Sequence, residues 1–267
     1  MNGYTSQLRW LAGIAISIGF IATAVLSTRA GVPLSERRSG YADLGRDTKA
    51  MQDDDAINPA TLWVLDGEAL WITKAGAANL ACSDCHGQAS DSMKGVAARY
   101  PAYDAAQKSP IDLEQRINIC RTEHQKATPF QLESKDMLAL TAYVGRQSRG
   151  IPIEESHDER LKPFIEAGRK LFFERQGQIN LSCAQCHDDN WGKHLAGSLI
   201  PQGHPTGYPL YRLEWQSLGS LQRRLRNCFI GMRAEPFAYG APEHVSLELF
   251  LKWRARGLKV ETPAVRP

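Results

Sequence analysis

The chain of 267 residues lacks several features that would place it in a common protein class. It has no pronounced run of lysine and arginine, so nucleic acid is not expected as a partner. Outside residues 10–26 it has no apolar run long enough to cross a membrane. Cysteine is scarce, with six in the whole chain. All six fall into one repeated pattern, which makes cysteine the most informative residue.

The apolar run from Trp10 to Leu26 follows Arg9 and ends near the small residues of Thr28-Arg29-Ala30. This pattern is typical of a secretory signal peptide, and the run is shorter than the roughly 20 residues of a spanning helix. An uncleaved anchor is the alternative. We predict a signal peptide at residues 1–30, a periplasmic location and no stable membrane association after cleavage. The remaining chain has 30 basic and 29 acidic residues, so it is nearly neutral.

The motif C-x-x-C-H occurs twice, as Cys82-Ser83-Asp84-Cys85-His86 and as Cys183-Ala184-Gln185-Cys186-His187. It is the attachment signature of c-type haem, in which two thioethers hold the porphyrin and the histidine binds the iron. A disulfide framework and a zinc site are alternatives, but neither requires a histidine directly after the second cysteine. We predict two covalently attached haem c groups. Their predicted attachment residues are Cys82, Cys85, Cys183 and Cys186, and their predicted iron ligands are His86 and His187.

The sequence around the two motifs is duplicated. A shift of 101 residues aligns the segments before the motifs and the motifs themselves, and the shift becomes 108 and then 107 after them. Each copy begins with an apolar stripe at helical spacing that has a glycine in its centre, Gly67 or Gly168. Each copy ends with another helix-like segment that contains an aromatic residue.

A helix with a central glycine, a haem motif and an aromatic-bearing last helix form the plan of a class I cytochrome c domain. We therefore predict an all-α fold built by tandem duplication of two class I cytochrome c-like domains. The first should span residues 58–150 and the second residues 151–267. Residues 31–57 are polar and poor in apolar positions, and we predict a mobile N-terminal arm that could wrap a partner.

Each copy also contains one lone cysteine, and these residues, Cys120 and Cys228, occupy equivalent positions. They could form a disulfide between the domains, remain buried thiols, or serve as the sixth ligands of the two irons. No methionine recurs at equivalent places in both copies. The duplicated position favours the ligand role. A thiolate ligand lowers the reduction potential of a haem, which suggests sulfur chemistry rather than a simple electron relay.

Arginines are more frequent near Cys228 than near Cys120. Arg224 lies four residues before Cys228 and therefore on the same face of a helix. Its guanidinium could hold an anionic substrate, or it could pair with a haem propionate as Arg116 would in the first copy. The arginine-rich surroundings predict that the second haem is the substrate site.

Three segments of the second copy resemble the SoxA family, the dihaem subunits of the SoxAX cytochromes of sulfur oxidation. They run from Leu195 to Arg212, from Glu214 to Cys228 and from Arg233 to Phe237. The resemblance implies an L-cysteine S-thiosulfotransferase, which couples thiosulfate oxidatively to a cysteine of a SoxYZ-type carrier protein. It also implies a monohaem SoxX-type cytochrome subunit as the partner.

The same resemblance implies the catalytic residues. Cys228 would be the cysteine ligand of the active-site haem, a residue often found as a persulfide in this family. Arg224 and an arginine of the last helix, Arg254 or Arg256, would hold the sulfur anion. Two other functions remain open from the sequence: a dihaem thiosulfate dehydrogenase that forms tetrathionate, and a plain electron-transfer dihaem cytochrome.

Overall fold

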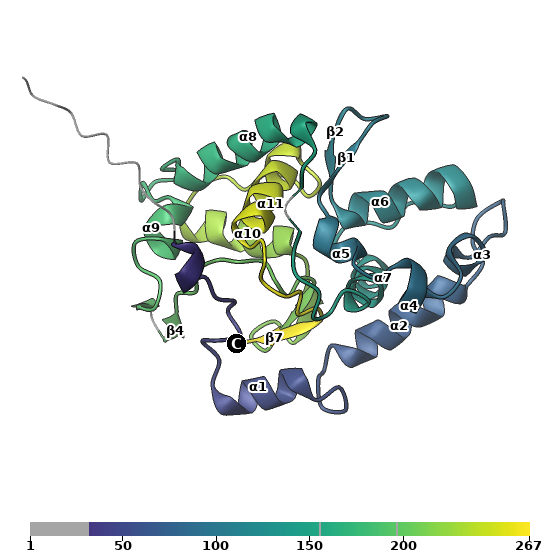
Figure 1. Cartoon of the computed structure of the whole chain (residues 1–267), viewed down its shortest axis with the longest axis horizontal. Coiled ribbons are helices and arrows are strands. Elements are labelled where there is room, and N and C mark those ends of the chain that lie inside the picture. Colours follow the sequence, from purple (N-terminus) through teal and green to yellow (C-terminus); the bar gives the residue numbers. More distant parts are fainter. Residues whose placement is uncertain (1–31, 155, 196) are drawn as a thin grey trace, which may run out of the picture. The chain divides into compact units, whose positions relative to one another are not determined.

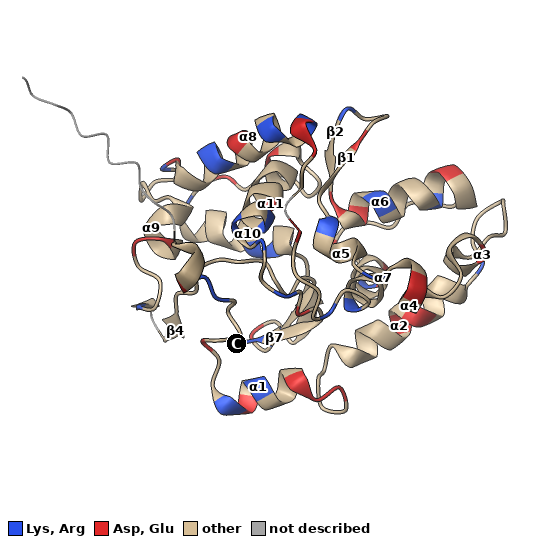
Figure 2. Cartoon of the chain, in the orientation of Figure 1, with Lys and Arg blue, Asp and Glu red and all other residues tan. Residues whose placement is uncertain are grey.

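The computed structural model describes residues 32–154, 156–195 and 197–267, so the predicted signal peptide lies outside the described residues. Among the helices that are described, none is long and apolar enough to cross a membrane. Figure 1 shows the arrangement of the elements. Basic and acidic residues alternate along the helices of the chain (Figure 2).

Both copies of the duplicated sequence share the order first helix, haem-motif helix, antiparallel hairpin, cysteine-bearing helix and last helix, and they differ in the elements between the haem-motif helix and the hairpin. The first copy comprises α2 (Thr61–Ile72), α3 (Cys82–His86), α4 (Ala89–Ser92), α5 (Val96–Arg99), β1 (Ala102–Asp104), β2 (Ser109–Ile111), α6 (Leu113–Cys120), a π-helical turn (Arg121–Gln125) and α7 (Lys135–Arg146). The second comprises a 3₁₀ turn (Glu159–Leu161), α8 (Lys162–Phe173), α9 (Cys183–His187), β3 (His194–Leu195), β4 (Ser198–Leu199), β5 (Leu210–Arg212), β6 (Ser217–Gly219), α10 (Leu221–Gly231) and α11 (Pro242–Arg254), and strand β7 (Ala264–Arg266) follows. The predicted tandem arrangement is therefore confirmed.

The first and last helices of each repeat cross in close contact. In the first repeat, a Cβ on Gly67 of α2 would collide with the backbone of Ala139 in α7. In the second, a Cβ on Gly168 of α8 would collide with the backbone of Ser246 in α11. Only glycine allows two helix backbones to approach so closely, and this outweighs its helix-propensity cost of about 1 kcal/mol.

The all-α prediction was too narrow, because each repeat also contains a short antiparallel hairpin. Strand β1 pairs with β2 in the first repeat, and β5 pairs with β6 in the second. Strand β7 then pairs in parallel with β5, which completes a three-stranded sheet in the order β6-β5-β7. A further small hairpin, β3-β4, follows α9. Strands of two or three residues are too short to give a recognisable alternation in the sequence.

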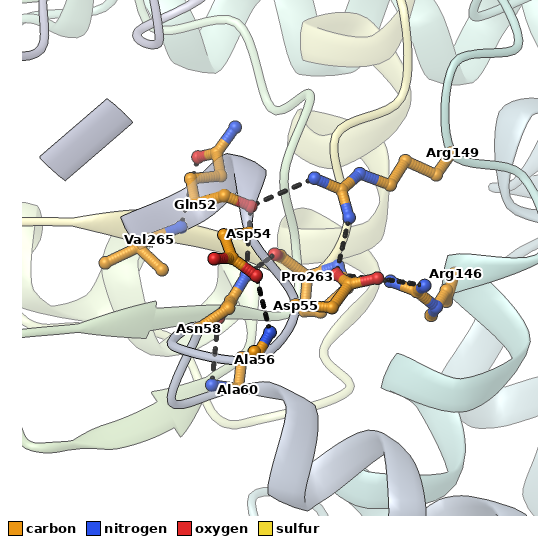
Figure 3. Close-up of polar contacts among 10 residues, drawn as sticks. All are labelled: Gln52, Asp54, Asp55, Ala56, Asn58, Ala60, Arg146, Arg149, Pro263 and Val265. Atoms are coloured by element: carbon orange, nitrogen blue, oxygen red, sulfur yellow. Dashed lines mark hydrogen bonds and ion pairs between the residues drawn. The ribbon is translucent and has the colours of Figure 1, made fainter. Parts of the chain in front are cut away.

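The segment predicted to be a mobile arm is instead packed against the rest of the chain. Its helix α1 (Arg46–Asp53) lies beside β7, and Gln52 Oε1 accepts a hydrogen bond of 3.1 Å from Val265 N. Asp55 forms ion pairs with Arg146 and Arg149 at 2.5 and 2.9 Å. Figure 3 shows how these polar contacts join the segment to α7 and to the C-terminal strand. The contacts use backbone groups and polar side chains, so the low hydrophobicity of the segment did not indicate them.

A small cavity of about 50 Å³ lies between the repeats and is lined by ionisable side chains. Asp112 and Glu114 come from the first repeat, and Glu248 and Lys252 come from α11 of the second. Burial raises the pKa of Asp112 to about 6 and that of Glu248 to about 8. Burial also lowers the pKa of Lys252. These directions favour neutral forms of groups that are removed from water.

The helix crossing predicts a large effect of one methyl group. Gly168→Ala should lower the free energy of unfolding by about 2–3 kcal/mol, because the new Cβ overlaps the backbone of α11. Gly231→Ala in α10 is the matched control, since nothing lies within 4 Å of its Cβ position. The control should change stability by less than about 1 kcal/mol. Denaturant unfolding at equal haem content measures both, and similar values for the two variants would contradict the close crossing.

The acidic cavity predicts a pH-dependent stability. Folding raises the pKa of Glu248, so between about pH 5 and pH 8 the folded protein holds a proton that the unfolded chain has released. The free energy of unfolding should therefore fall as the pH rises through this range. In Glu248→Gln, the decrease in the free energy of unfolding over this pH range should be smaller by roughly 1–3 kcal/mol. Glu243→Gln, at an exposed position of the same helix, is the control. Urea unfolding at pH 5, 7 and 9 tests the prediction, which fails if the parent and Glu248→Gln have the same pH dependence.

Candidate haem-binding and active site

Each C-x-x-C-H motif forms one short helix after a tight loop. The loop is closed by a bridge between Ala75 and Leu80 in the first repeat and between Gln176 and Leu181 in the second. Ser182 caps α9, because its Oγ accepts a hydrogen bond of 3.4 Å from Gln185 N. Within one helical turn the two cysteines, three residues apart, lie on the same side. This spacing suits two thioether bonds to one porphyrin.

The lone cysteine of each repeat lies near the motif cysteines of that repeat. Burial raises the pKa of Cys183 to about 12, and the charge of Cys228 contributes to the shift. Burial also raises the pKa of Cys120, to which the charge of Cys85 contributes. All six cysteines are free, so the disulfide alternative for Cys120 and Cys228 is not formed. Each repeat thus brings together the two cysteines of its motif and a third thiol.

The histidine of the second motif is held in a defined orientation. His187 Nδ1 lies 2.7 Å from the carbonyl oxygen of Pro201. Because a carbonyl oxygen can only accept a hydrogen bond, Nδ1 must carry the proton, and Nε2 is left with a free lone pair for a metal. Burial lowers the pKa of His187 and favours its neutral form. The donor set of Cys183, Cys186, His187 and Cys228 therefore fits a covalently attached haem.

The two motif histidines differ in their surroundings. His86 is exposed, and within the described chain it forms no side-chain hydrogen bond. Its ring packs near Trp71, with 5.8 Å between the ring centroids. His187, by contrast, is half-buried and bonded to Pro201. The second site is therefore the more strongly organised of the two.

Arg224 and Arg212 form a pair of cations beside Cys228. Arg224 lies one turn before Cys228 on α10, and its side chain forms no ion pair or hydrogen bond with the residues that the structure describes. Arg212 comes from β5 and pairs at 2.8 Å with the exposed carboxylate of Glu214. Burial lowers the pKa of Arg212, the charge of Arg224 lowers it further, and that of Cys228 raises it. Two guanidinium groups and a thiol thus share one region.

The first repeat has the opposite charge at one of these positions. The shift of 108 residues aligns Arg116 with Arg224 and Asp104 with Arg212. Arg116 Nη2 lies 2.5 Å from Asp104 Oδ2, so this arginine is already paired within the protein. Replacing a carboxylate by a guanidinium changes the local charge by two units. The sequence reasoning missed Arg212, although a comparison of the two repeats at this position could have identified it.

Arg254, one of the two arginines predicted from the last helix, lies against α9. Its guanidinium forms two bonds with Asp188, at 2.6 and 3.2 Å, and packs 4.1 Å from the ring centroid of Phe172. Arg256 lies over the ring of Trp253, 4.2 Å from its centroid. The contacts of Arg254 therefore place its charge beside the residue that follows His187. Its predicted role in holding the substrate stays a prediction.

The comparisons with known proteins agree with this organisation. A family model described as SoxA/TsdA, cytochrome c domain, matches residues 66–153 and 167–260. The L-cysteine S-thiosulfotransferase subunit SoxA of Pseudaminobacter salicylatoxidans is 38% identical over 237 residues, covering 88% of this chain and 83% of that protein. The protein of the same name from Rhodovulum sulfidophilum is 36% identical over 267 residues, covering 96% and 93%. The crystal structure of SoxXA from P. pantotrophus contains a chain that matches with a TM-score of 0.82 and 31% identity, over 86% of both chains.

The buried ion pair beside His187 predicts a large loss of stability when it is broken. Asp188 and Arg254 each have a side chain that is 7% exposed. Asp188→Asn leaves a buried charge without its counterion and should cost about 3 kcal/mol. Glu166→Gln is the control, because the ion pair of Glu166 with Arg169 is exposed and should contribute less than about 1 kcal/mol. Thermal unfolding at equal haem content distinguishes them, and an equal effect of the two substitutions would refute the prediction.

Proposed function

The chain belongs to the SoxA/TsdA cytochrome c family, and we propose that it holds two haem c groups and acts as an L-cysteine S-thiosulfotransferase. The reaction joins thiosulfate to the cysteine thiol of a carrier protein. A sulfur-to-sulfur bond forms, the thiol loses its proton, and two electrons are released. The names of the relatives support this activity, and the charge distribution around Cys228 supports the second repeat as its site.

The observation that carries the proposal is the excess of positive charge around Cys228. Thiosulfate has two negative charges, and a deprotonated carrier cysteine adds a third. In the first repeat Asp104 pairs with Arg116, whereas in the second Arg224 has no ion-pair partner among the described residues and Arg212 pairs only with the exposed carboxylate of Glu214. Guanidinium groups bind sulfonate-type oxygens through paired N–H donors. The same two cations reduce the repulsion between the reacting anions, which lowers the barrier to their coupling.

The roles of the individual residues follow from their positions. Cys183 and Cys186 attach the second haem, and Cys82 and Cys85 attach the first. His187 and Cys228 would bind the iron of the second haem, and His86 and Cys120 would bind that of the first. When bound, the haem accepts electrons one at a time. Arg212 and Arg224 hold the substrate anion next to the Cys228 sulfur, which as a thiolate or persulfide is the soft sulfur centre of the site.

Two protein partners complete the proposal. A monohaem SoxX-type cytochrome would accept the electrons, and a SoxYZ-type protein would supply the carrier cysteine. The similarity to a chain of the SoxXA structure supports the first partner. The predicted signal peptide supports a periplasmic location.

A charge reversal at residue 212 tests the proposed site. Arg212→Asp gives the second repeat the residue type of the first, and the new carboxylate can pair with Arg224 as Asp104 pairs with Arg116. We expect a loss of about 100-fold in kcat/KM for thiosulfate coupling to a carrier thiol, because one cation is removed and the other is neutralised. The same assay with Arg116→Ala, the equivalent arginine of the first repeat, should retain most activity. Full activity of Arg212→Asp at normal haem content would disprove this site.

Thiosulfate dehydrogenase activity is the second candidate, because the matching family model includes both SoxA and TsdA in its description. Product analysis separates the two functions. Our proposal expects a carrier protein that gains a thiosulfonate group, observable by its mass. Formation of tetrathionate at a comparable rate without any carrier would favour the dehydrogenase instead.

A further inference from the structure

The N-terminal strap, residues 34–43, lies on the loop that follows the second haem motif. Gln202 of this loop is 1% exposed and uses both atoms of its amide to bind the strap. Its Oε1 accepts a hydrogen bond of 2.9 Å from Arg38 N, and its Nε2 donates one of 2.9 Å to Glu36 O. His204 Nδ1 donates to Arg38 O at 2.8 Å. The strap thus satisfies two buried side chains of the loop through its backbone.

The loop that is held by the strap is the loop that contacts His187. The Pro201 carbonyl oxygen accepts the hydrogen bond from His187 Nδ1 at 2.7 Å. Gly203 also packs on the imidazole, because a Cβ at this position would lie 3.0 Å from His187 Cγ and Nδ1. Pro201 and Gly203 therefore contact the imidazole of His187, and Gln202 between them contacts the strap.

The side chain of Arg38 adds a second anchor. Its guanidinium lies 4.8 Å from the ring centroid of Trp191 and pairs with Asp43 at 2.7 Å. Both ends of the loop between α9 and β5 are therefore in contact with the strap. A cation that faces an indole ring stabilises such a contact by roughly 0.5–2 kcal/mol.

The first repeat has no counterpart of this arrangement in the part of the chain that the structure describes. The alignment shift rises from 101 to 108 between the haem motif and the hairpin, so the second copy is seven residues longer there. The additional length supplies the loop that folds back over His187. His86 has an exposed ring without such a loop over it. The strap therefore serves one haem site and not the other.

We propose that the N-terminal strap is a positioning element for His187, acting through Gln202 and the carbonyl oxygen of Pro201. A fixed acceptor at Nδ1 sets the orientation of the imidazole and increases its basicity as an iron ligand. A histidine ligand that is more basic stabilises the ferric state, so the strap keeps the reduction potential of the second haem low. The inference rests on the proposed function only in taking His187 as an iron ligand.

A proline substitution at position 38 removes the backbone donor of this contact. Arg38→Pro deletes the N–H that binds Gln202 Oε1, and Arg37 already has φ −65° and ψ 131°, a conformation suited to the residue before proline. Arg38→Ala is the matched control, because it loses the same side chain and keeps the N–H. Gln202→Ala breaks the contact from the other side.

The test uses the mature protein with both haems attached and measures each haem separately. In Arg38→Pro and Gln202→Ala the reduction potential of the second haem should rise, and the Nδ1 proton of His187 should exchange with solvent at least tenfold faster in paramagnetic NMR spectra. Arg38→Ala should retain most of the parent values, and the first haem should be unaffected in all three variants.

Unchanged potentials and exchange rates in both Arg38→Pro and Gln202→Ala would overturn the positioning role. An equal shift in Arg38→Ala and Arg38→Pro would also overturn it, because the side chain and not the backbone contact would then be responsible. Failure of the proposed function has a different signature, since a parent protein with no carrier-coupled thiosulfate activity would still show these spectroscopic differences between the variants.

Discussion

The crossing of two helices at a glycine is the constraint on which each repeat depends. Because the backbones of α2 and α7 touch at Gly67, and those of α8 and α11 touch at Gly168, neither pair can slide without a collision. In each repeat one short loop, closed by a β-bridge, connects the first helix of the pair to the haem motif. The position of the crossed helices therefore also determines where the motif cysteines lie. The helix that carries the lone cysteine then packs beside the crossed pair. A duplicated crossing therefore produces two similar haem-binding frameworks.

The two frameworks differ in charge at a few positions around the same backbone. Asp104 and Arg212 occupy equivalent strands, and each faces the arginine that precedes its cysteine by one turn. When this position holds a carboxylate, as in the first repeat, the arginine forms an ion pair within the protein. With a second guanidinium the two cations need an external anion to reduce their mutual repulsion. A single difference in charge thus gives the second repeat the excess of positive charge on which its proposed substrate site rests, without any change of fold.

The sequence was sufficient to predict the haem motifs, the long helices and their duplication, because these features rest on residues that are close together or regularly spaced. Three others were not predicted for physical reasons. The hairpins have strands too short for a periodic pattern, and Arg212 lies 16 residues before Cys228, so its proximity depends on the return of the β5-β6 hairpin. The N-terminal segment packs through Gln52, Gln202 and backbone groups instead of apolar side chains. Polar composition indicates disorder only when such buried partners are absent.

The charges of the second site are arranged unevenly between its two ligand residues, and this arrangement has a chemical consequence. Near His187 the positive charge of Arg254 is cancelled by Asp188, and both side chains are buried. Near Cys228 the charge of Arg224 has no such partner in the described chain, and that of Arg212 faces only an exposed carboxylate, which water screens. The positive charge that has no buried counterion therefore comes from Arg224 on α10 and Arg212 on β5, and the charge of Arg224 also acts on His187, whose pKa it lowers. In the proposed function, an anion that binds between these two guanidinium groups would reduce the repulsion that each of them experiences.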